Sequence, residues 1–234
     1  MQLVEIVSTD HSNPEIVQAV SAFARQIDRL PLPVRSTPGF LVNRILMPYL
    51  LEAVEMLAEG VAPERIDATA TEFGMPMGPV ELADTVGLDV CLSVAEILSA
   101  RLGGTVPDLL RQKVAAKEFG RKTGKGFYVY RNDRPVLARP SYTEKPPIAI
   151  RERLVSRLLN EAMVCLREQV VKDEDLLDAG IIFGTGFAPF RGGPMHYSHK
   201  IGFAHQKAQF EELSLAYGNR FQPDHGWDSF KNAS

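Results

Sequence analysis

The pattern of apolar and polar residues changes once along the chain, from a strand-and-helix start to a long helical remainder. Short extended runs at 3–7 and 31–35 flank a stretch whose apolar residues recur at helical spacing. Asn13 and Pro14 suit the cap and first position of that helix. The pattern therefore predicts a β-α-β unit over residues 1–36, and such a unit needs a larger parallel sheet.

The remainder of the chain reads as a series of helices. Pro63 and Pro79 are placed to start helices, and Gly74 is placed to end one. Residues 131–148 hold four prolines and few apolar residues, which predicts a linker.

Two stretches of the helical part, 43–79 and 151–194, share one sequence pattern. Each carries a Glu-Ala pair on its apolar stripe, and Glu161 follows Glu52 by 109 positions. Phe-Gly and Gly-Pro pairs follow in both stretches, with five extra residues between the glycines of the second. A repeat this long indicates a duplicated domain, since solenoid units run roughly 20–50 residues.

Composition excludes several classes of protein. The net charge of −3 offers no basic surface for nucleic acid or anionic lipid. The apolar runs fall short of the roughly 18 residues that a membrane span needs. Cys91 and Cys165 lie in helical patterns, which favours buried, reduced thiols and a cytoplasmic location. His196 and His199 form an H-x-x-H pair without a third ligand, so we expect no metal site.

Three features are candidates for chemistry, and each has a structural alternative. Glu5 lies inside an apolar strand, where it either faces water on an edge strand or holds a histidine. Asn43, near the junction between the two parts, is either a helix cap or a surface residue, or it binds a ligand. The basic loop 120–126 lacks P-loop spacing, so it is either a solvated loop or a contact to a phosphorylated cofactor.

Four motifs in order, together with the duplication, resemble the 3-hydroxyacyl-CoA dehydrogenases. They are LVEIV at 3–7, PGFLVNR at 38–44, FGMPMGP at 73–79 and GRKTGKGFY at 120–128. The second copy carries GTGFAPFRGGP at 184–194, which resembles the multifunctional fatty-acid β-oxidation α-subunit rather than the single-copy enzyme.

The resemblance implies a mainly α fold with two tandem similar helical domains of the 6-phosphogluconate-dehydrogenase C-terminal type. The implied boundaries are 1–36 for the end of an NAD-binding Rossmann domain, 37–130 for the first helical copy, 131–148 for the linker and 149–234 for the second copy. Single-copy members of the family dimerise through this domain. We therefore expect the two copies to form a pseudo-dimer within one chain.

The resemblance also implies a role for four residues in NAD-dependent oxidation of L-3-hydroxyacyl-CoA. Glu5 matches a Glu that orients the catalytic His, and Asn43 matches an Asn that binds substrate. Phe183 falls where some relatives place an aromatic residue near the substrate, and Lys122 resembles a Lys near the cofactor.

No Gly-x-Gly-x-x-Gly motif occurs in the chain, and no histidine lies where the family places its catalytic one. We therefore expect this polypeptide to be inactive alone and to require separate Rossmann and hydratase parts. The family leaves a thiolase subunit open as a further partner.

Two other functions stay open. One is a non-catalytic module that binds acyl-CoA or mediates dimerisation, which a missing catalytic histidine favours. The other is a dehydrogenase of the kind that acts on sugar acids, in which an all-helical domain completes a Rossmann site. The duplication argues against the second.

Overall fold

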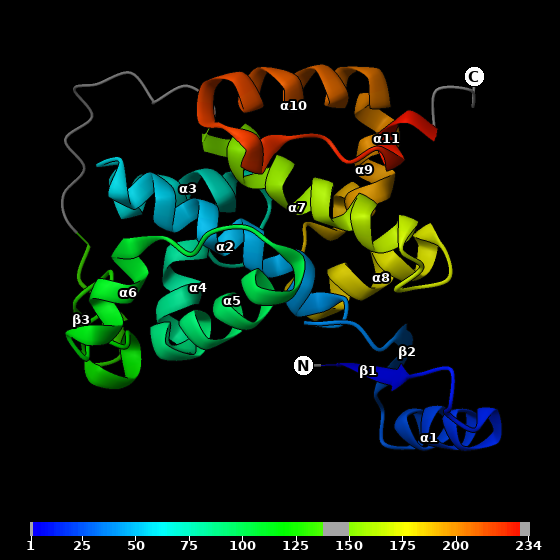
Figure 1. The fold of residues 1–234 in the computed structure, drawn as a ribbon. Helices are drawn as coiled ribbons and strands as arrows, with labels where there is room; N and C mark the ends of the chain where they lie inside the picture. Colours follow the sequence, from blue (N-terminus) through cyan, green and yellow to red (C-terminus); the bar gives the residue numbers. More distant parts are fainter. Residues whose placement is uncertain (1, 138–149, 230–234) are drawn as a thin grey trace. The chain divides into compact units, whose positions relative to one another are not determined.

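The computed structural model describes residues 2–137 and 150–229, most of which are helical (Figure 1). The elements in chain order are β1 (Leu3–Ser8), α1 (Pro14–Gln26), β2 (Leu30–Arg35), α2 (Val42–Ala58), α3 (Pro63–Phe73), α4 (Pro79–Val86), α5 (Leu88–Leu102), α6 (Asp108–Ala115), η1 (Arg121–Thr123), β3 (Tyr130–Arg131), β4 (Arg134–Pro135), α7 (Ile150–Arg167), α8 (Glu174–Thr185), η2 (Pro189–Arg191), α9 (Pro194–Ile201), α10 (Phe203–Tyr217), η3 (Asn219–Phe221) and α11 (Gly226–Ser229). The predicted mainly α fold with a β-α-β start is confirmed.

β1 and β2 pair in parallel, with Leu3 opposite Leu30, and α1 connects them. The predicted cap is present, because Asn13 Oδ1 accepts a hydrogen bond of 2.8 Å from the N–H of Glu15. Among the described residues, no third strand joins this sheet. One stripe of α1 and its C-terminal cap is apolar and exposed: Ile16, Val20, Phe23 and, at the cap, Ile27.

The chain divides into two compact units, and both units contain residues from each copy of the repeat. The first unit comprises Met1–Leu46 and Leu158–Ser234, and the second comprises Met47–Arg157. α2 therefore begins in the first unit and continues into the second, whereas α7 begins in the second and ends in the first. The predicted domain boundaries follow the repeat instead, and they stay a prediction.

The two copies share one structural feature, a buried aspartate whose carboxylate binds the N–H groups at the start of a helix. In the second unit, Asp67 accepts hydrogen bonds from the N–H groups of Val80 and Glu81, at 2.8 and 3.0 Å. These groups open α4, so the carboxylate satisfies N–H groups that have no partner within the helix. A Cβ on Gly78 would collide with the Asp67 side chain, so the close approach requires glycine.

In the first unit, Asp178 accepts bonds of 2.7 and 2.9 Å from the N–H groups of Met195 and His196, at the start of α9. A Cβ on Gly193 would collide with Asp178. Burial raises the pKa of Asp178 to about 6, against the opposing effect of the two N–H groups, and that of Asp67 also to about 6. The Gly-Pro pairs that reveal the repeat thus mark the same helix start twice.

The glycines of the basic loop serve a similar close approach. The N–H groups of Phe127 and Tyr128 each donate a 2.9 Å hydrogen bond to the carboxylate of Asp84. A Cβ on Gly126 would collide with that carboxylate. The loop continues into the short β3–β4 hairpin, which lies at the start of the predicted linker. Residues 138–148 of that linker lie outside the described residues.

Candidate functional site

The side chain of Glu5 reaches from β1 to the start of α2. Its Oε1 atom accepts hydrogen bonds from the N–H of Leu41, at 2.8 Å, and of Val42, at 3.3 Å. Burial raises the pKa of the Glu5 carboxyl, and the two N–H groups partly oppose that rise. Glu5 is half-buried rather than turned to water as an edge-strand residue would be. Among the described residues, the hydrogen bonds to this carboxylate all reach Oε1.

The turn before α2 is strained at an aromatic residue. Gly39 and Phe40 both have positive φ, at 76° and 51°. Positive φ is uncommon outside glycine, and for a bulky side chain it is an outlier. Among the described residues, Phe40 is the only apolar non-glycine with positive φ, and its side chain is 38% exposed. Its strain is therefore not offset by burial in a core.

Asn43 is the second residue of α2 and is exposed. It does not cap the helix, because the carboxylate of Glu5 already binds the N–H groups there. Among the described residues its side-chain amide makes no hydrogen bond. Both the donor and the acceptor of this amide are therefore open to a ligand.

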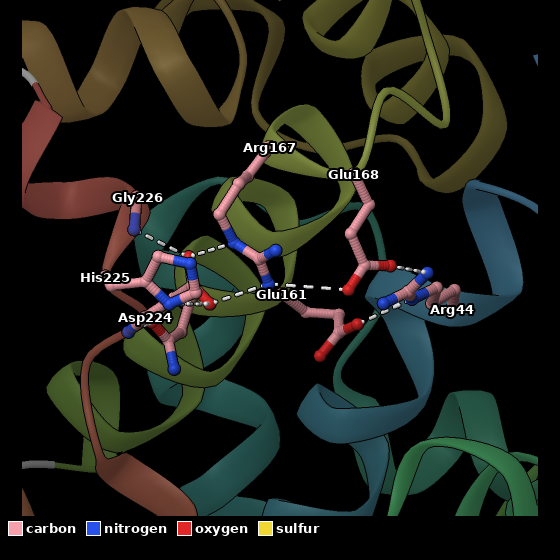
Figure 2. Close-up of polar contacts among 8 residues, drawn as sticks. Arg44, Glu161, Arg167, Glu168, Asp224, His225 and Gly226 are labelled. Carbon is pink, nitrogen blue, oxygen red and sulfur yellow. Dashed lines mark hydrogen bonds and ion pairs between the residues drawn. The ribbon is translucent and has the colours of Figure 1, made fainter.

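Arg44 follows Asn43 and is buried, with 3% of its side chain exposed. Its Nε lies 2.7 Å from Glu161 Oε1, and a terminal nitrogen lies 2.8 Å from Glu168 Oε2 (Figure 2). Burial alone would lower the pKa of Arg44, but Cys165 and the two glutamates raise it above its ordinary value. The guanidinium therefore stays charged and links the start of α2 to α7.

The second unit contains the same arrangement. Arg153, on α7, has 2% of its side chain exposed, and its Nε lies 2.7 Å from Glu52 Oε1 on α2. It also pairs with Glu59, the residue that directly follows the end of α2. Arg153, Glu161 and Glu168 each follow Arg44, Glu52 and Glu59 by 109 positions. The residue before Arg153 is Glu152, so this second cluster has no counterpart of Asn43.

α8 packs against the start of α2 through two glycines. A Cβ on Gly184 would touch a Val42 methyl at 2.7 Å, and one on Gly180 would touch a Leu41 methyl at 2.8 Å. Phe183 lies between them in the sequence of α8 and is 46% exposed. The first unit thus brings Glu5, Asn43 and Phe183 to one region around the start of α2.

Lys122 belongs to the other unit. Its Nζ lies 2.6 and 2.7 Å from the two carboxylate oxygens of Asp89, at the start of α5. The same ammonium lies 5.4 Å from the centre of the Phe119 ring. Lys122 therefore makes a defined contact within its own unit.

The two histidines of the H-x-x-H pair lie on α9 and are used separately. His199 Nε2 lies 2.7 Å from Glu174 Oε2 on α8, whereas the backbone N–H of His196 binds Asp178. Within residues 2–137 and 150–229, no group of three or more His, Cys, Asp or Glu is arranged to hold a metal ion. No helix among these residues is long and apolar enough to span a bilayer.

Residue-level reading of the sequence missed the cluster around Arg44. A signal was available, because the arginine and both glutamates recur at a constant offset of 109 positions. Comparing the copies position by position would have marked all six residues as a set.

Comparison with known proteins identifies the class. A family model described as the C-terminal domain of 3-hydroxyacyl-CoA dehydrogenase matches residues 39–130, which hold Asn43, Arg44 and the Asp67 and Asp84 contacts. Residues 39–130 therefore carry a C-terminal domain of the 3-hydroxyacyl-CoA dehydrogenase family.

Within that family the chain is similar to the α-subunits of fatty acid oxidation complexes. It is 37% identical over 236 residues to fatty acid oxidation complex subunit alpha of Shewanella baltica (strain OS185), and 38% identical over 236 residues to that of Shewanella putrefaciens (strain CN-32 / ATCC BAA-453). Each match covers 95% of this chain and 33% of the relative. The chain thus spans about a third of the length of these relatives.

Solved structures share the fold. The crystal structure of 3-hydroxybutyryl-CoA dehydrogenase from Escherichia coli K12 matches with a TM-score of 0.84 at 23% identity, covering 98% of this chain and 67% of that one. (S)-3-hydroxybutyryl-CoA dehydrogenase PaaH1 from Ralstonia eutropha is 40% identical with a TM-score of 0.54, covering 56% of this chain and 48% of that one.

Proposed function

We propose that this chain supplies the substrate-binding helical part of an L-3-hydroxyacyl-CoA dehydrogenase of fatty-acid β-oxidation. The reaction oxidises 3-hydroxyacyl-CoA with NAD to 3-oxoacyl-CoA and NADH. The observation that carries the proposal is the arrangement at the start of α2. There the half-buried carboxylate of Glu5 binds the helix start, and the exposed amide of Asn43 falls among the residues that the family model matches.

In this proposal Glu5 orients the imidazole of a catalytic histidine supplied by a dinucleotide-binding part. The N–H groups of Leu41 and Val42 fix the carboxylate through Oε1, which leaves Oε2 to accept the imidazole N–H. A carboxylate held in this way selects the histidine tautomer and stabilises the imidazolium. Asn43 hydrogen-bonds the substrate, and Phe183 offers apolar surface beside it.

The described residues do not by themselves fit a dinucleotide. The turn after β1 is closed by Thr9 and Ser12, and Asn13 caps α1, so no glycine-rich turn leads from this strand into its helix. Lys122 is the residue we assign near the cofactor, and its ammonium is held by Asp89. We therefore infer that these residues are inactive by themselves and need a dinucleotide-binding Rossmann part for turnover.

The test is NADH oxidation with acetoacetyl-CoA, by the chain alone and by the chain mixed with the dinucleotide-binding part of a related α-subunit. We expect turnover only in the mixture. Turnover by the chain alone would contradict the proposal that another part supplies the catalytic histidine. Binding without turnover in a mixture whose fragment completes a related enzyme would favour the alternative, a non-catalytic acyl-CoA-binding or dimerisation module.

Glu5→Gln tests the role of the carboxylate, because the glutamine oxygen can still accept from Leu41 and Val42. We expect near-normal stability and a fall in the turnover of the mixture of about 10²–10⁴-fold. Asp178→Asn is the matched control, since Asp178 holds a helix start in the same unit without belonging to the proposed site. Equal losses in the two variants would show that Glu5 acts only as a cap.

A further inference from the structure

We propose that Arg44 is a positioning residue for substrate binding. Its buried ion pairs fix the first turn of α2, so that Asn43 and the two N–H groups held by Glu5 keep the geometry that the substrate requires. This inference rests on the proposed function, in which Asn43 contacts the substrate.

The contacts of Arg44 hold the helix against rotation as well as translation. Glu161 lies on α7, and Glu168 is the residue that directly follows the end of this helix. The planar guanidinium meets one carboxylate through Nε and the other through a terminal nitrogen, at 2.7 and 2.8 Å (Figure 2). A rigid fork between two fixed carboxylates leaves little freedom for the residue beside it, Asn43.

The carboxylate of Glu168, the second partner of Arg44, is itself held in place. Glu168 lies 3.4 Å from a terminal nitrogen of Arg167, whose guanidinium binds Asp224 at 2.8 and 3.0 Å (Figure 2). Asp224 also accepts a 2.8 Å hydrogen bond from the N–H of Gly226. The network therefore extends from the start of α2 to the C-terminal segment before α11.

A purely structural role is the competing explanation, and the chain contains its own control for it. Arg153 is buried to the same degree as Arg44 and pairs with two glutamates at equivalent positions. Its neighbour in sequence is Glu152, and no proposed site residue lies next to it. Replacing Arg153 removes the same chemistry without touching the start of α2.

The experiment compares Arg44→Met and Arg153→Met in the full chain. The first readout is hydrogen exchange at the N–H groups of Leu41 and Val42. We expect exchange there to rise about tenfold or more in Arg44→Met and to stay unchanged in Arg153→Met. Arg44→Lys should restore part of the protection, because an ammonium keeps the charge but not the fork.

The second readout is binding of acetoacetyl-CoA to the chain mixed with the dinucleotide-binding part. We expect Arg44→Met to weaken binding by about tenfold, the value of one positioned hydrogen bond, and Arg153→Met to leave it within about twofold. The inference would be overturned if Arg44→Met and Arg153→Met changed the hydrogen exchange of Leu41 and Val42 equally and also changed acetoacetyl-CoA binding equally. If the wild-type mixture binds no acetoacetyl-CoA, the proposed function fails, and exchange alone decides whether Arg44 holds α2.

Discussion

The cluster of Arg153, Glu52 and Glu59 allows a quantitative prediction about the second unit. Arg153 and Glu52 are almost fully buried, at 2% and 1% exposed, whereas the side chain of Glu59 is 41% exposed. Breaking a buried pair costs about 3–5 kcal/mol because a charge stays behind without its partner. An exposed pair contributes about 1 kcal/mol or less.

We therefore expect Glu52→Met to lower the free energy of unfolding by about 3 kcal/mol or more, and Glu59→Met by about 1 kcal/mol or less. The double variant Arg153→Met with Glu52→Met removes both buried charges and should recover most of the loss. The coupling free energy between the two single changes should then be about 2 kcal/mol or more.

The assay is urea unfolding followed by far-UV circular dichroism. Fluorescence of Trp227, the single tryptophan, reports the first unit and so serves as the control probe. If the losses of Glu52→Met and Arg153→Met simply add in the double variant, the buried pair does not act as a pair and the reasoning is wrong.

Three further predictions concern single residues. Burial raises the pKa of Asp178 to about 6 in the folded chain, against about 3.9 when unfolded, so the stability of the wild type falls as pH rises between these values. Asp178→Asn lacks this titration. In urea titrations its free energy of unfolding, relative to that of the wild type, should therefore rise by about 2 kcal/mol between pH 4.5 and 7.5. A difference that does not vary with pH would mean an unshifted carboxyl. Phe40→Gly should raise the melting temperature by relieving about 1 kcal/mol of strain, and a fall in the melting temperature would give the Phe40 side chain a stabilising role instead. Lys122→Met should cost no more than about 1 kcal/mol in urea unfolding, yet raise the KM for NADH in the complemented assay, and an unchanged KM would remove Lys122 from the cofactor site.

The features that the sequence predicted well are those decided by neighbouring residues. The Asn13 cap, the helix starts at Pro63 and Pro79 and the left-handed end at Gly74 all follow from the chemistry of one to three residues. Such local preferences act wherever the segment lies in the fold, so reading them needs no knowledge of the partners.

The features that the sequence did not predict depend on distant partners. The strand pattern marked Glu5 as unusual, but the N–H groups that it binds are 36 and 37 residues away. Arg44 and Glu161 are 117 residues apart. Neither residue type nor spacing within one segment selects such a partner, because the pairing is set by how α2 and α7 pack. Only the constant offset between the copies carried that information.

The duplication explains why the copies and the compact units do not coincide. Arg44 comes from the first copy and pairs with two glutamates of the second copy, whereas Arg153 comes from the second copy and pairs with two glutamates of the first. Each unit thus completes its buried ion cluster with a residue from the other copy. Because an unpaired buried charge is costly, neither copy carries all the partners that its own buried residues need. The two copies are therefore visible as repeats in the sequence, but neither folds as a compact unit by itself. Because α2 of one copy and α7 of the other each supply residues to both ion clusters, the two copies depend on each other for folding.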